Sequence, residues 1–554
     1  MKKRTLAMLL CVVMLLSLLA ACGSDSSTSD ETEETTEEEI EEAEDTAEET
    51  AEEASTSAGG ISYPVGSGET FTVSVIIDSN NLSTVPNEDP AQTNGMQLMQ
   101  EATGVNFEYT IFAMLSDGMT LMIASGDWTD VFAKIDESYS SGLEGALDDE
   151  VIMDLAPYVE EYAPDYYAYL TSDSTLEKQC YTDDGQMGAF MNFSVSATSG
   201  FAIRMDWLEE AGYTEVPETF DELEEAALAV LNNHPELESV FPMASSMAGE
   251  GYESELMYGF GINSISYEFY LQEDGTVGYV WTSDNARDYL TMIARWVDEG
   301  LLNRDEMISG DLSDYGNRLY YGESLMKHGG TDMWGDDMLS MVEDDDFELA
   351  PMNYPTVEAG ETIRYGREAA TAATGWSIST TCENPELLMQ VINWLYTDEG
   401  SIAMNFGEED VSYIINEDGE YEFTELVTNN PDGIAMYLAV AIYTGFETPT
   451  IGLQEQADAK LTNDYQFEAQ EFWSTQSRDT SGIRHGNLTT EESEELAAFS
   501  DIDTYVQEKV LAFAVGELEL TDENWDEFVS NVEAMGIDEI IQIYQDAQDR
   551  YDSR

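Results

Sequence analysis

The order of apolar and polar positions from residue 61 onward predicts alternating strands and helices. Phe71 to Ile77 is typical of a buried strand, Gln97 to Thr103 has helical spacing, and Val105 to Phe112 again has a strand pattern. A helix that closes at Leu121 to Ala124 is followed by a turn and a short apolar strand, Asp130 to Ala133. Alternation of this kind predicts a mainly parallel sheet and an α/β fold.

Turn and cap residues predict further elements along the chain. Asp-Gly turns within 181–189 and 271–279 are each flanked by strand formers and predict two β-hairpins. Residues 284–300 and 384–400 have helical apolar spacing, and each segment ends in a glycine, as a helix C-cap would. Thr219 with Glu222 three residues later predicts a capping box at the start of another helix.

The first 22 residues have the pattern of an export signal. Lys2, Lys3 and Arg4 precede an apolar run, 6–19, that is shorter than the roughly 20 residues needed to span a bilayer. The run ends in Leu-Ala-Ala-Cys22, which resembles the lipobox of bacterial lipoproteins. We expect residues 1–21 to be removed and Cys22 to carry the lipid. The alternative is an ordinary secretory signal followed by a coincidental cysteine.

Residues 22–60 are predicted to form a lipid-anchored, acidic, disordered linker. They contain sixteen carboxylates between Asp25 and Glu53, and no aromatic residue, so this tract cannot bury a core. The whole chain has 19 basic and 115 acidic residues and a net charge of -96. Such a field opposes the binding of nucleic acids and polyanions, although the charge can also be only an adaptation for solubility.

The remaining chain, from about Ile61 to Arg554, is long enough for two domains and has no later apolar run of membrane-spanning length. We therefore expect it to be soluble and outside the cytoplasm. Cys180 and Cys382 could form one disulfide, which the sequence cannot establish. No cofactor is expected, because the histidines lack zinc-site or Ser-His-Asp spacing. The histidines are His234, His328 and His485.

Several segments, taken in order, carry a resemblance to a known family. Residues 201–212 (FAIRMDWLEEAG) and 216–223 (VPETFDEL) are similar to the "Arg-x-Asp-Trp-Leu, then Pro-x-Thr-x-Asp-Glu" segment of the extracellular solute-binding proteins that serve carbohydrate ABC transporters. Residues 124–132 resemble the family's "Gly-x-x-Pro-Asp-Val" strand, although Thr129 stands where proline is usual. Further matching segments are 320–326, 375–379, 384–386 and 394–400. Residues 405–409 and 520–528 resemble the long lipoprotein branch assigned to oligosaccharides.

The resemblance implies a two-lobe fold of the type II periplasmic-binding-protein (Venus flytrap) kind, with hinge crossovers. One lobe would comprise residues 61–195 and 373–450, and the other 196–372 and 451–554. Ligand would favour closure because it contacts both lobes only in the closed state. The implied function is that of a lipoprotein on the outer face of the cell membrane that captures an oligosaccharide and delivers it to ABC permease subunits. Such a protein is expected to be a monomer and not an enzyme.

The family's fold and the chemistry of sugars together suggest the site residues. Sugars pair apolar C–H faces with hydroxyls, so their sites combine aromatic rings with polar side chains at the carboxyl ends of strands. The loop 134–139 follows one predicted strand, and 329–334 follows another. We expect ligand contacts from Asp136, Tyr139, Asp332, Trp334, Arg367, Trp376 and Glu409. Each of these can instead be a solvated loop residue or, for the tryptophans, a core residue.

Other candidate residues have a stronger structural explanation. Arg204 and Trp207 match the family motif but are expected to serve lobe packing, and Trp296, Trp394 and Trp525 fall at the helical spacing of core residues. Carboxylate clusters at 332–337 and 343–346 could hold calcium, which needs six to eight oxygen ligands. They lack the EF-hand spacing, so a solvated acidic face is the simpler interpretation.

Three other functions remain open from the sequence. A peptide-binding transport lipoprotein would share the same fold. A surface glycoside hydrolase would need two carboxylates about 5 to 10 Å apart, which a chain with 115 acidic residues cannot exclude by counting. An adhesion or sensor module would share the linker but lack the crossover pattern. The sugar, its length and its linkage are not indicated. The negative charge weakly disfavours polyuronates, although a local arginine such as Arg367 could still bind a uronate carboxylate.

Overall fold

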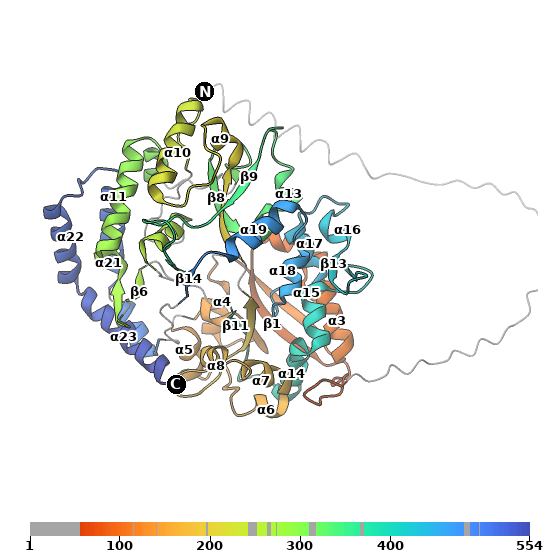
Figure 1. Ribbon diagram of the computed structural model, residues 1–554. Helices are drawn as coiled ribbons and strands as arrows, with labels where there is room; N and C mark the ends of the chain where they lie inside the picture. The colour runs from red at the N-terminus through yellow and green to blue at the C-terminus, as the bar shows by residue number, and fades with distance from the viewer. Residues whose placement is uncertain are drawn as a thin grey trace, which may run out of the picture. The chain divides into compact units, whose positions relative to one another are not determined.

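The computed structural model describes residues 56–554 apart from 115, 140, 196–197, 242–251, 263–267, 273, 310–316, 366–369, 481–487 and 498. The predicted signal, Cys22 and nearly all of the predicted linker therefore lie outside the described residues. The described residues belong to one compact unit of helices and strands (Figure 1). None of the helices within the described ranges is both long enough and apolar enough to cross a bilayer.

A five-stranded sheet organises the N-terminal part of the chain and the segment after residue 369. Its strand order is β2-β1-β3-β11-β4, in which β1 is parallel to β2 and β3, whereas β11 is antiparallel to β3 and β4. Because β4 is antiparallel to β11, it runs in the same direction as β1, β2 and β3, so the expectation of a mainly parallel sheet holds for four of the five strands and is wrong for β11 alone. The apolar periodicity of residues 370–378 could not show that β11 runs in the opposite direction, because the chain returns to this sheet only after forming the second sheet. The strands are β1 (Thr70–Ile77), β2 (Asn106–Ala113), β3 (Val131–Ala133), β4 (Phe190–Val195) and β11 (Ala370–Ile378).

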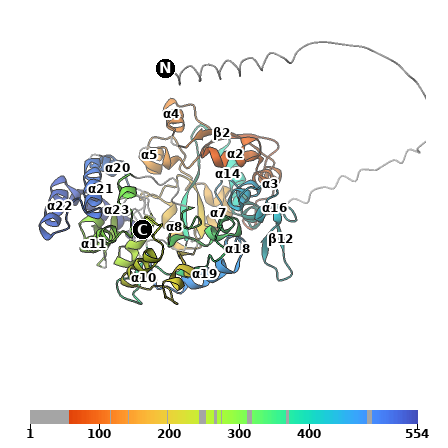
Figure 2. The same cartoon turned by 90° about the horizontal axis from the view of Figure 1, so that it is seen from above.

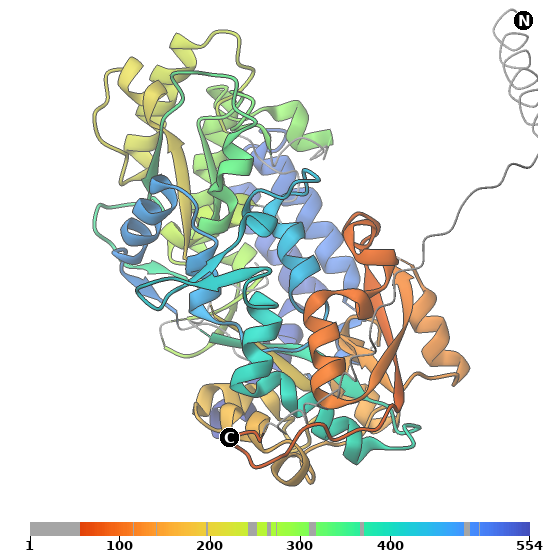
Figure 3. The same ribbon diagram turned by 90° about the vertical axis from the view of Figure 1, so that its right-hand side faces the viewer.

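Helices from the N-terminal part of the chain and from the segment after β11 pack around the sheet and form one apolar core. Figure 3 shows the orange strands and helices of the first part of the chain beside the teal helices that return to them. Val73 and Phe132 are fully buried in this core together with Leu388 and Leu395. The helices are α2 (Ser79–Thr84), α3 (Asn94–Thr103), α4 (Gly118–Ser125), α5 (Gly142–Asp148), α6 (Val159–Tyr162), α7 (Pro164–Leu170), α8 (Ser174–Cys180), α14 (Pro385–Asn393) and α15 (Asp398–Phe406).

A small satellite follows α15. It consists of the hairpin β12 (Tyr413–Ile415) and β13 (Tyr421–Phe423) with the short helices α16 (Glu425–Thr428) and α17 (Met436–Tyr443). Phe406, Tyr413, Phe423 and Val427 form its own buried cluster.

The start of the described chain is fastened to this first core. Gly59 N–H donates to Asp165 Oδ1 at 2.8 Å. Asn393 Nδ2 donates to Asp165 Oδ2 at 2.7 Å and to the Tyr63 hydroxyl at 3.2 Å, while Asn393 Oδ1 accepts from the Asp165 N–H at 2.8 Å. The buried Asn393 thus holds together the first described segment, α7 and α14. A buried carboxylate needs such partners, because burial without hydrogen bonds is costly.

The second sheet is antiparallel throughout, with the order β8-β5-β9. The predicted hairpin within 271–279 is confirmed, since β6 and β7 pair antiparallel across the Asp274-Gly275 turn. At 181–189 only the turn forms, closed by the Thr182 N–H bond to the Gln186 carbonyl at 2.9 Å. The strands of the second sheet are β5 (Ser199–Arg204), β8 (Met326–Gly330) and β9 (Leu349–Met352). The hairpin strands are β6 (Phe269–Leu271) and β7 (Val277–Tyr279), and a separate parallel pair is formed by β10 (Ile363–Arg364) and β14 (Arg478–Asp479).

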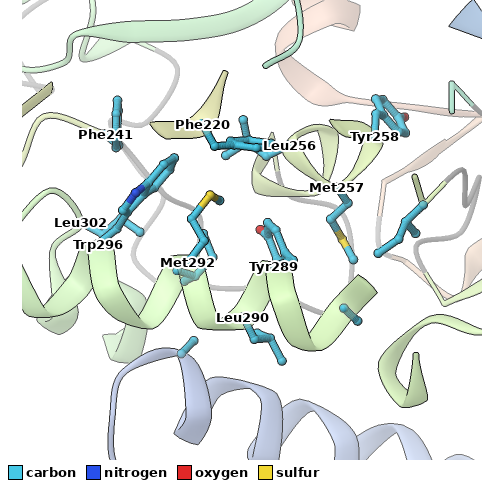
Figure 4. Close-up of a cluster of buried hydrophobic side chains, with 14 of the residues drawn as sticks. Phe220, Phe241, Leu256, Met257, Tyr258, Tyr289, Leu290, Met292, Trp296 and Leu302 are labelled. Atoms are coloured by element: carbon cyan, nitrogen blue, oxygen red, sulfur yellow. The ribbon is translucent and has the colours of Figure 1, made fainter. Parts of the chain in front are cut away.

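A second large core lies around α11, which is amphipathic. Figure 4 shows Trp296, Met292 and Tyr289 of α11 pointing toward Phe241, Phe220 and Leu256, while Leu290 points to the opposite side, toward a C-terminal helix. Trp296, Trp394 and Trp525 are all buried, as their spacing predicts. The helices of this part are α9 (Met205–Glu210), α10 (Phe220–Asn233), α11 (Asp284–Asp298), α12 (Arg304–Ser309), α13 (Asp336–Leu339), α18 (Gln454–Ala459), α19 (Asp464–Ser474), α20 (Thr490–Ala497), α21 (Ser500–Ala514), α22 (Asp522–Met535) and α23 (Ile537–Ser553).

The predicted helix caps are confirmed at two helices and wrong at a third. The Thr219–Glu222 capping box forms at α10, and Gly300 follows α11 with φ +79°. Residues 384–400, however, do not form one helix, because Thr397 Oγ1 accepts from the Gly400 N–H at 3.1 Å and starts α15. Gly400 is therefore inside a helix, where a Cβ would lie 1.8 Å from the Trp394 carbonyl oxygen. Close backbone packing, not a C-cap, requires glycine there.

The last helix, α23, contacts both parts of the chain. Its first residues, Ile537 and Ile540, belong to the core around α11. Its end lies against α8 (Figures 1 and 2), where Arg550 and Arg554 both donate to the Asp183 carboxylate. Arg554 Nη1 also donates to the Lys178 carbonyl at 3.0 Å. We call Asp183, Arg550 and Arg554 the C-terminal latch.

The two cysteines of the described chain are unpaired. Cys180 and Cys382 are both buried and free, so the disulfide that the sequence left open is absent from this structure. Burial raises the pKa of the Cys180 thiol to about 12 and that of Cys382 to about 11. Both therefore behave as small apolar core residues.

Candidate functional site

The strongest candidate site lies where β3 ends beside β11, at the edge of the five-stranded sheet from which the chain leaves toward the second sheet. Ala133 pairs with Trp376, and the Lys134 N–H donates to the Gly375 carbonyl at 2.8 Å. Lys134 has φ +52°, a left-handed conformation that is unusual for a residue other than glycine. Carboxyl ends of strands are where α/β proteins bind ligands.

Gly375 allows a second segment to approach this edge. The pairing of β11 with β4 shifts register between Thr374 and Trp376, which places a β-bulge at Gly375. A Cβ on Gly375 would lie 2.4 Å from the Phe190 carbonyl oxygen and 2.7 Å from Pro449 Cβ. The chain around 447–450 can therefore pack directly against the sheet edge only because residue 375 is glycine.

Glu447 completes the edge and is also in a left-handed conformation. Its φ is +53°, and its carbonyl accepts from Trp376 Nε1 at 3.0 Å. Its Oε2 lies 2.7 Å from Lys134 Nζ, with 45% of the Lys134 side chain and 22% of the Glu447 side chain exposed. Two residues with strained backbones thus form an ion pair with each other. Strain of about 1–3 kcal/mol per residue persists only where surrounding contacts enforce it, and it gathers at ligand-binding sites.

The charges around the pair are mostly negative. Burial alone lowers the pKa of Lys134, but the Glu447 carboxylate outweighs it and, with Glu137 and Asp136, raises the pKa above its usual value. The amine is therefore firmly protonated. Asp136 is exposed in the 3-10 helix η3 (Ile135–Glu137), directly after the pair. An accessible ammonium and several accessible carboxylates together offer both donors and acceptors to a polar solute.

Tyr139 follows in the same loop and is half-buried. Its hydroxyl donates to an Asp149 carboxylate oxygen. Desolvation, together with the Asp149 charge, raises the pKa of Tyr139 to about 12, so the phenol is neutral. The loop 134–139 therefore carries Lys134, Asp136 and Tyr139 on one short stretch of chain beside Glu447.

The two predicted stacking tryptophans are fully buried in this structure. Trp376 packs in the core of the five-stranded sheet, 5.5 Å from the Phe107 ring. Trp334, in the 3-10 helix η7 (Thr331–Trp334) after β8, packs 6.1 Å from Tyr320 and 6.0 Å from Tyr465. In this conformation neither ring offers an exposed face. Direct contact of either ring with a ligand stays a prediction that requires a different conformation.

The remaining predicted site residues are not brought to the Lys134–Glu447 edge by any described contact. Asp332 lies in η7, and its side chain is outside the described part of the structure, as is the whole of Arg367. Glu409 is exposed in the loop between α15 and β12, where it forms an isolated bridge with Tyr413. The predicted roles of these residues stay predictions.

The edge of the second sheet carries a buried polar network that the sequence did not reveal. His328 Nε2 lies 2.8 Å from the Tyr354 hydroxyl, and Ser199 Oγ lies 3.1 Å from Tyr354 and 3.0 Å from Tyr365. Arg478 Nη2 donates to the Ser199 carbonyl at 2.7 Å. Ser199 begins β5, and Tyr365 follows β10. The network thus fixes the second sheet where the chain enters and leaves it.

The contacts of Arg204 agree with packing. Its side chain is 1% exposed and donates to Asp206 and to Asp344, the latter at 2.8 Å. Its guanidinium also stacks 4.4 Å from the Trp207 ring. Among the described residues, no three His, Cys, Asp or Glu side chains gather in a way that could hold a metal ion.

Comparison with known proteins gives consistent matches. The family model for bacterial extracellular solute-binding proteins matches residues 88–402. The fructooligosaccharide ABC transporter substrate-binding protein FusA of Streptococcus pneumoniae serotype 4 is 23% identical over 261 residues, which is 44% of this chain. The match covers 47% of FusA, so the chain spans about half the length of this curated relative.

Solved structures match over a larger share of the chain. The alginate-binding protein AlgQ2, solved without calcium ion, has a TM-score of 0.67 at 20% identity, covering 87% of this chain and 98% of AlgQ2. An extracellular solute-binding protein from Bifidobacterium longum subsp. infantis has a TM-score of 0.67 at 18% identity, covering 90% of this chain and all of that protein. At such identities the likeness establishes the fold.

Proposed function

The chain belongs to the family of bacterial extracellular solute-binding proteins, and we propose that it captures an oligosaccharide between two α/β lobes and delivers it to the permease of an ABC importer. Proteins of this family bind and hand over solutes and are not enzymes. We propose further that Cys22 carries a lipid that holds the protein at the outer face of the membrane. The residues 61–195 with 373–450, and 196–372 with 451–554, are the proposed lobes.

One observation carries the proposal: the strained Lys134–Glu447 edge at the carboxyl end of β3. The left-handed backbones, the bulge at Gly375 and the bond from Trp376 hold this accessible pair in place. With Asp136 it presents a set of donors and acceptors that suits a solute with many hydroxyls. The sequence relative FusA, which is named for fructooligosaccharides, supports a sugar over a peptide.

The second lobe would supply the other half of the site. The Ser199, His328 and Tyr354 network fixes the edge that would close on the ligand. Closure needs ligand contacts that exist only in the closed state, and its extent is set by the difference in affinity between the two states. Asp332, Trp334, Arg367, Trp376 and Glu409 remain the predicted additional contacts.

The test is retention of oligosaccharides by the purified full chain on an array that carries neutral glycans, uronate and sialylated glycans, and peptides. The proposal expects retention of one oligosaccharide class, recovered uncleaved, and a rise in melting temperature with its concentration. Recovery of cleaved products would instead indicate a glycoside hydrolase. Retention of peptides alone would overturn the sugar assignment.

The lipid anchor has a separate test. Metabolic labelling with an alkyne fatty acid should mark the wild-type protein, and Cys22→Ser should abolish the label and release the protein from cells. If the C22S protein is still labelled, the proposal that Cys22 carries the lipid is wrong, and the proposed binding function is unaffected.

A further inference from the structure

The charge of the proposed solute is the question that the fold leaves open, because the matching structures include a protein named for alginate, a polyuronate, and the sequence relative is named for a neutral sugar. We infer that the Lys134–Glu447 ion pair makes the site selective for uncharged oligosaccharides, with Glu447 as the residue that excludes acidic sugars. This inference rests on the proposed function and specifies its substrate class.

The distribution of positive charge is the first argument. Within residues 71–177 and 368–459, which supply nearly all of four of the five strands and most of the segments around the sheet, the sequence contains a single Lys or Arg, and it is Lys134. An acidic sugar bound at this edge would have only Lys134 to pair with from these segments. Glu447 Oε2 already lies 2.7 Å from Lys134 Nζ.

The local charge balance is the second argument. The carboxylates that act on Lys134 are those of Glu447, Glu137 and Asp136. One positive charge thus faces three negative charges at the sheet edge. A uronate or sialate that entered would have to displace Glu447 and would then meet the two remaining carboxylates, which is costly for like charges at short range.

The backbone is the third argument, because it keeps the main chain of Glu447 beside Lys134. Its carbonyl is held by Trp376 Nε1, and the adjacent segment is seated against Gly375. Lys134 is held by its own N–H bond to the Gly375 carbonyl. The backbones of Lys134 and Glu447 are therefore bonded to two adjacent residues of β11, Gly375 and Trp376.

The pair retains the groups that a neutral sugar needs. An ammonium has three donors and a carboxylate has two acceptor oxygens, so an ion pair leaves donors and acceptors available on both partners. The exposed fractions, 45% for Lys134 and 22% for Glu447, show that the pair can be reached. A hydroxyl can donate to Glu447 while a neighbouring ring oxygen or hydroxyl accepts from Lys134.

The experiment compares the full-length chain with Glu447→Gln on a glycan array of neutral, uronate and sialylated oligosaccharides. Glu447→Gln keeps the size of the side chain and removes one negative charge about 6 Å from a bound carboxylate. At an effective dielectric constant of about 40 this corresponds to about tenfold in affinity. We expect the wild type to retain neutral glycans and E447Q to gain about tenfold in affinity for acidic glycans.

Glu137→Gln is the matched control. It changes the net charge by the same amount in the same neighbourhood but leaves the ion pair intact. If E137Q raises the affinity for acidic glycans as much as E447Q does, the pair has no specific role and the inference is wrong. The inference is also overturned if the wild type retains acidic glycans, although the proposed function then stands. If no glycan of any class is retained, the proposed function itself fails.

Discussion

Asp183→Asn should loosen the end of α23 without unfolding the protein. Asp183 accepts from both Arg550 and Arg554, and these are the charged contacts that fasten the last turn of α23 to the turn after α8. Asparagine keeps an acceptor oxygen in the same place but removes the charge. Arg550 remains bound to Glu492 by two bonds of 2.7 Å, so the helix end is weakened and not released.

The free-energy cost of Asp183→Asn can be estimated from the hydrogen bonds that are lost and from the solvent exposure of their side chains. A hydrogen bond to a charged group contributes about 1.5–3 kcal/mol when it is well shielded. Asp183 is 18% exposed, Arg554 14% and Arg550 32%, so solvent screening reduces the value to about 1 kcal/mol for each arginine. The expected cost of D183N is about 2 kcal/mol for local opening of the helix end, which corresponds to about 30-fold faster amide exchange.

Hydrogen exchange measured by mass spectrometry on peptides from the last ten residues is the assay. A melting temperature would be insensitive, because a protein of this size loses only about 1 °C per kcal/mol. Asp184→Asn is the matched control, since Asp184 is exposed next to Asp183 and no hydrogen bond or ion pair to its side chain is seen. Equal exchange in D183N and D184N would refute the argument that the latch holds the helix end.

The pH dependence adds a second measurement on the same helix end. Burial raises the pKa of Asp183, but the bonds from Arg550 and Arg554 outweigh it and hold the pKa below its usual value. A carboxyl group with a lowered folded pKa contributes stability that is present above its unfolded pKa, near 4, and is lost as pH falls through the folded pKa. Asp183 itself should therefore stay charged between pH 7 and pH 5, and its bonds to Arg550 and Arg554 should be lost only in stronger acid.

Three further substitutions test the packing. Gly400→Ala should destabilise the first core by about 3 kcal/mol or more, because its Cβ would lie 1.8 Å from the Trp394 carbonyl oxygen, and loss of soluble protein or a lowered urea midpoint would show this. Thr219→Ala should cost about 1 kcal/mol by removing the cap of α10, which predicts roughly fivefold faster exchange at the first turn, whereas exposed Thr214→Ala should have no effect. Lys327 is buried 4.9 Å from the Tyr320 ring, and desolvation lowers its pKa to about 8. At this position the unfolded chain then binds more protons than the folded chain between about pH 8 and pH 10.5, so the urea midpoint of the wild type relative to that of Lys327→Met should rise across this window, because the other titrating groups are common to both proteins.

Much of the fold could be predicted because its signals are local. The strand at β1 and the cap at Thr219 depend on residues within one turn or one strand, and both are found where the sequence predicts them. The antiparallel entry of β11 depends on a partner strand more than two hundred residues away, and no periodicity encodes it. The break between α14 and α15 was missed because the helical apolar spacing continues past the end of α14 up to Tyr396, and the cap at Thr397 follows it directly.

The candidate site was predicted only in part, for a related reason. The loop 134–139 was found because it follows a predicted strand. Glu447 was missed, because a left-handed glutamate that pairs with a residue over three hundred positions earlier leaves no mark on its own neighbourhood. Trp334 and Trp376 were chosen for their chemistry as stacking residues, yet both lie in cores, which the sequence could not distinguish from a site.

The interleaving of the two cores determines how the protein can be made. In the five-stranded sheet, β11 lies between β3 and β4. The hydrogen-bond partner of buried Asp165 is Asn393, which is synthesised 228 residues later. The core around α11 likewise needs Ile502, Phe528 and Ile540. During synthesis and export, which deliver the chain from its N-terminus, neither core can be completed before the last third of the chain emerges. A fragment that ends at β4 would expose an unpaired strand, and a truncation within α21–α23 would leave the second core incomplete. Until the whole chain has crossed the membrane, a protease that degrades unfolded proteins would therefore find an incompletely folded substrate.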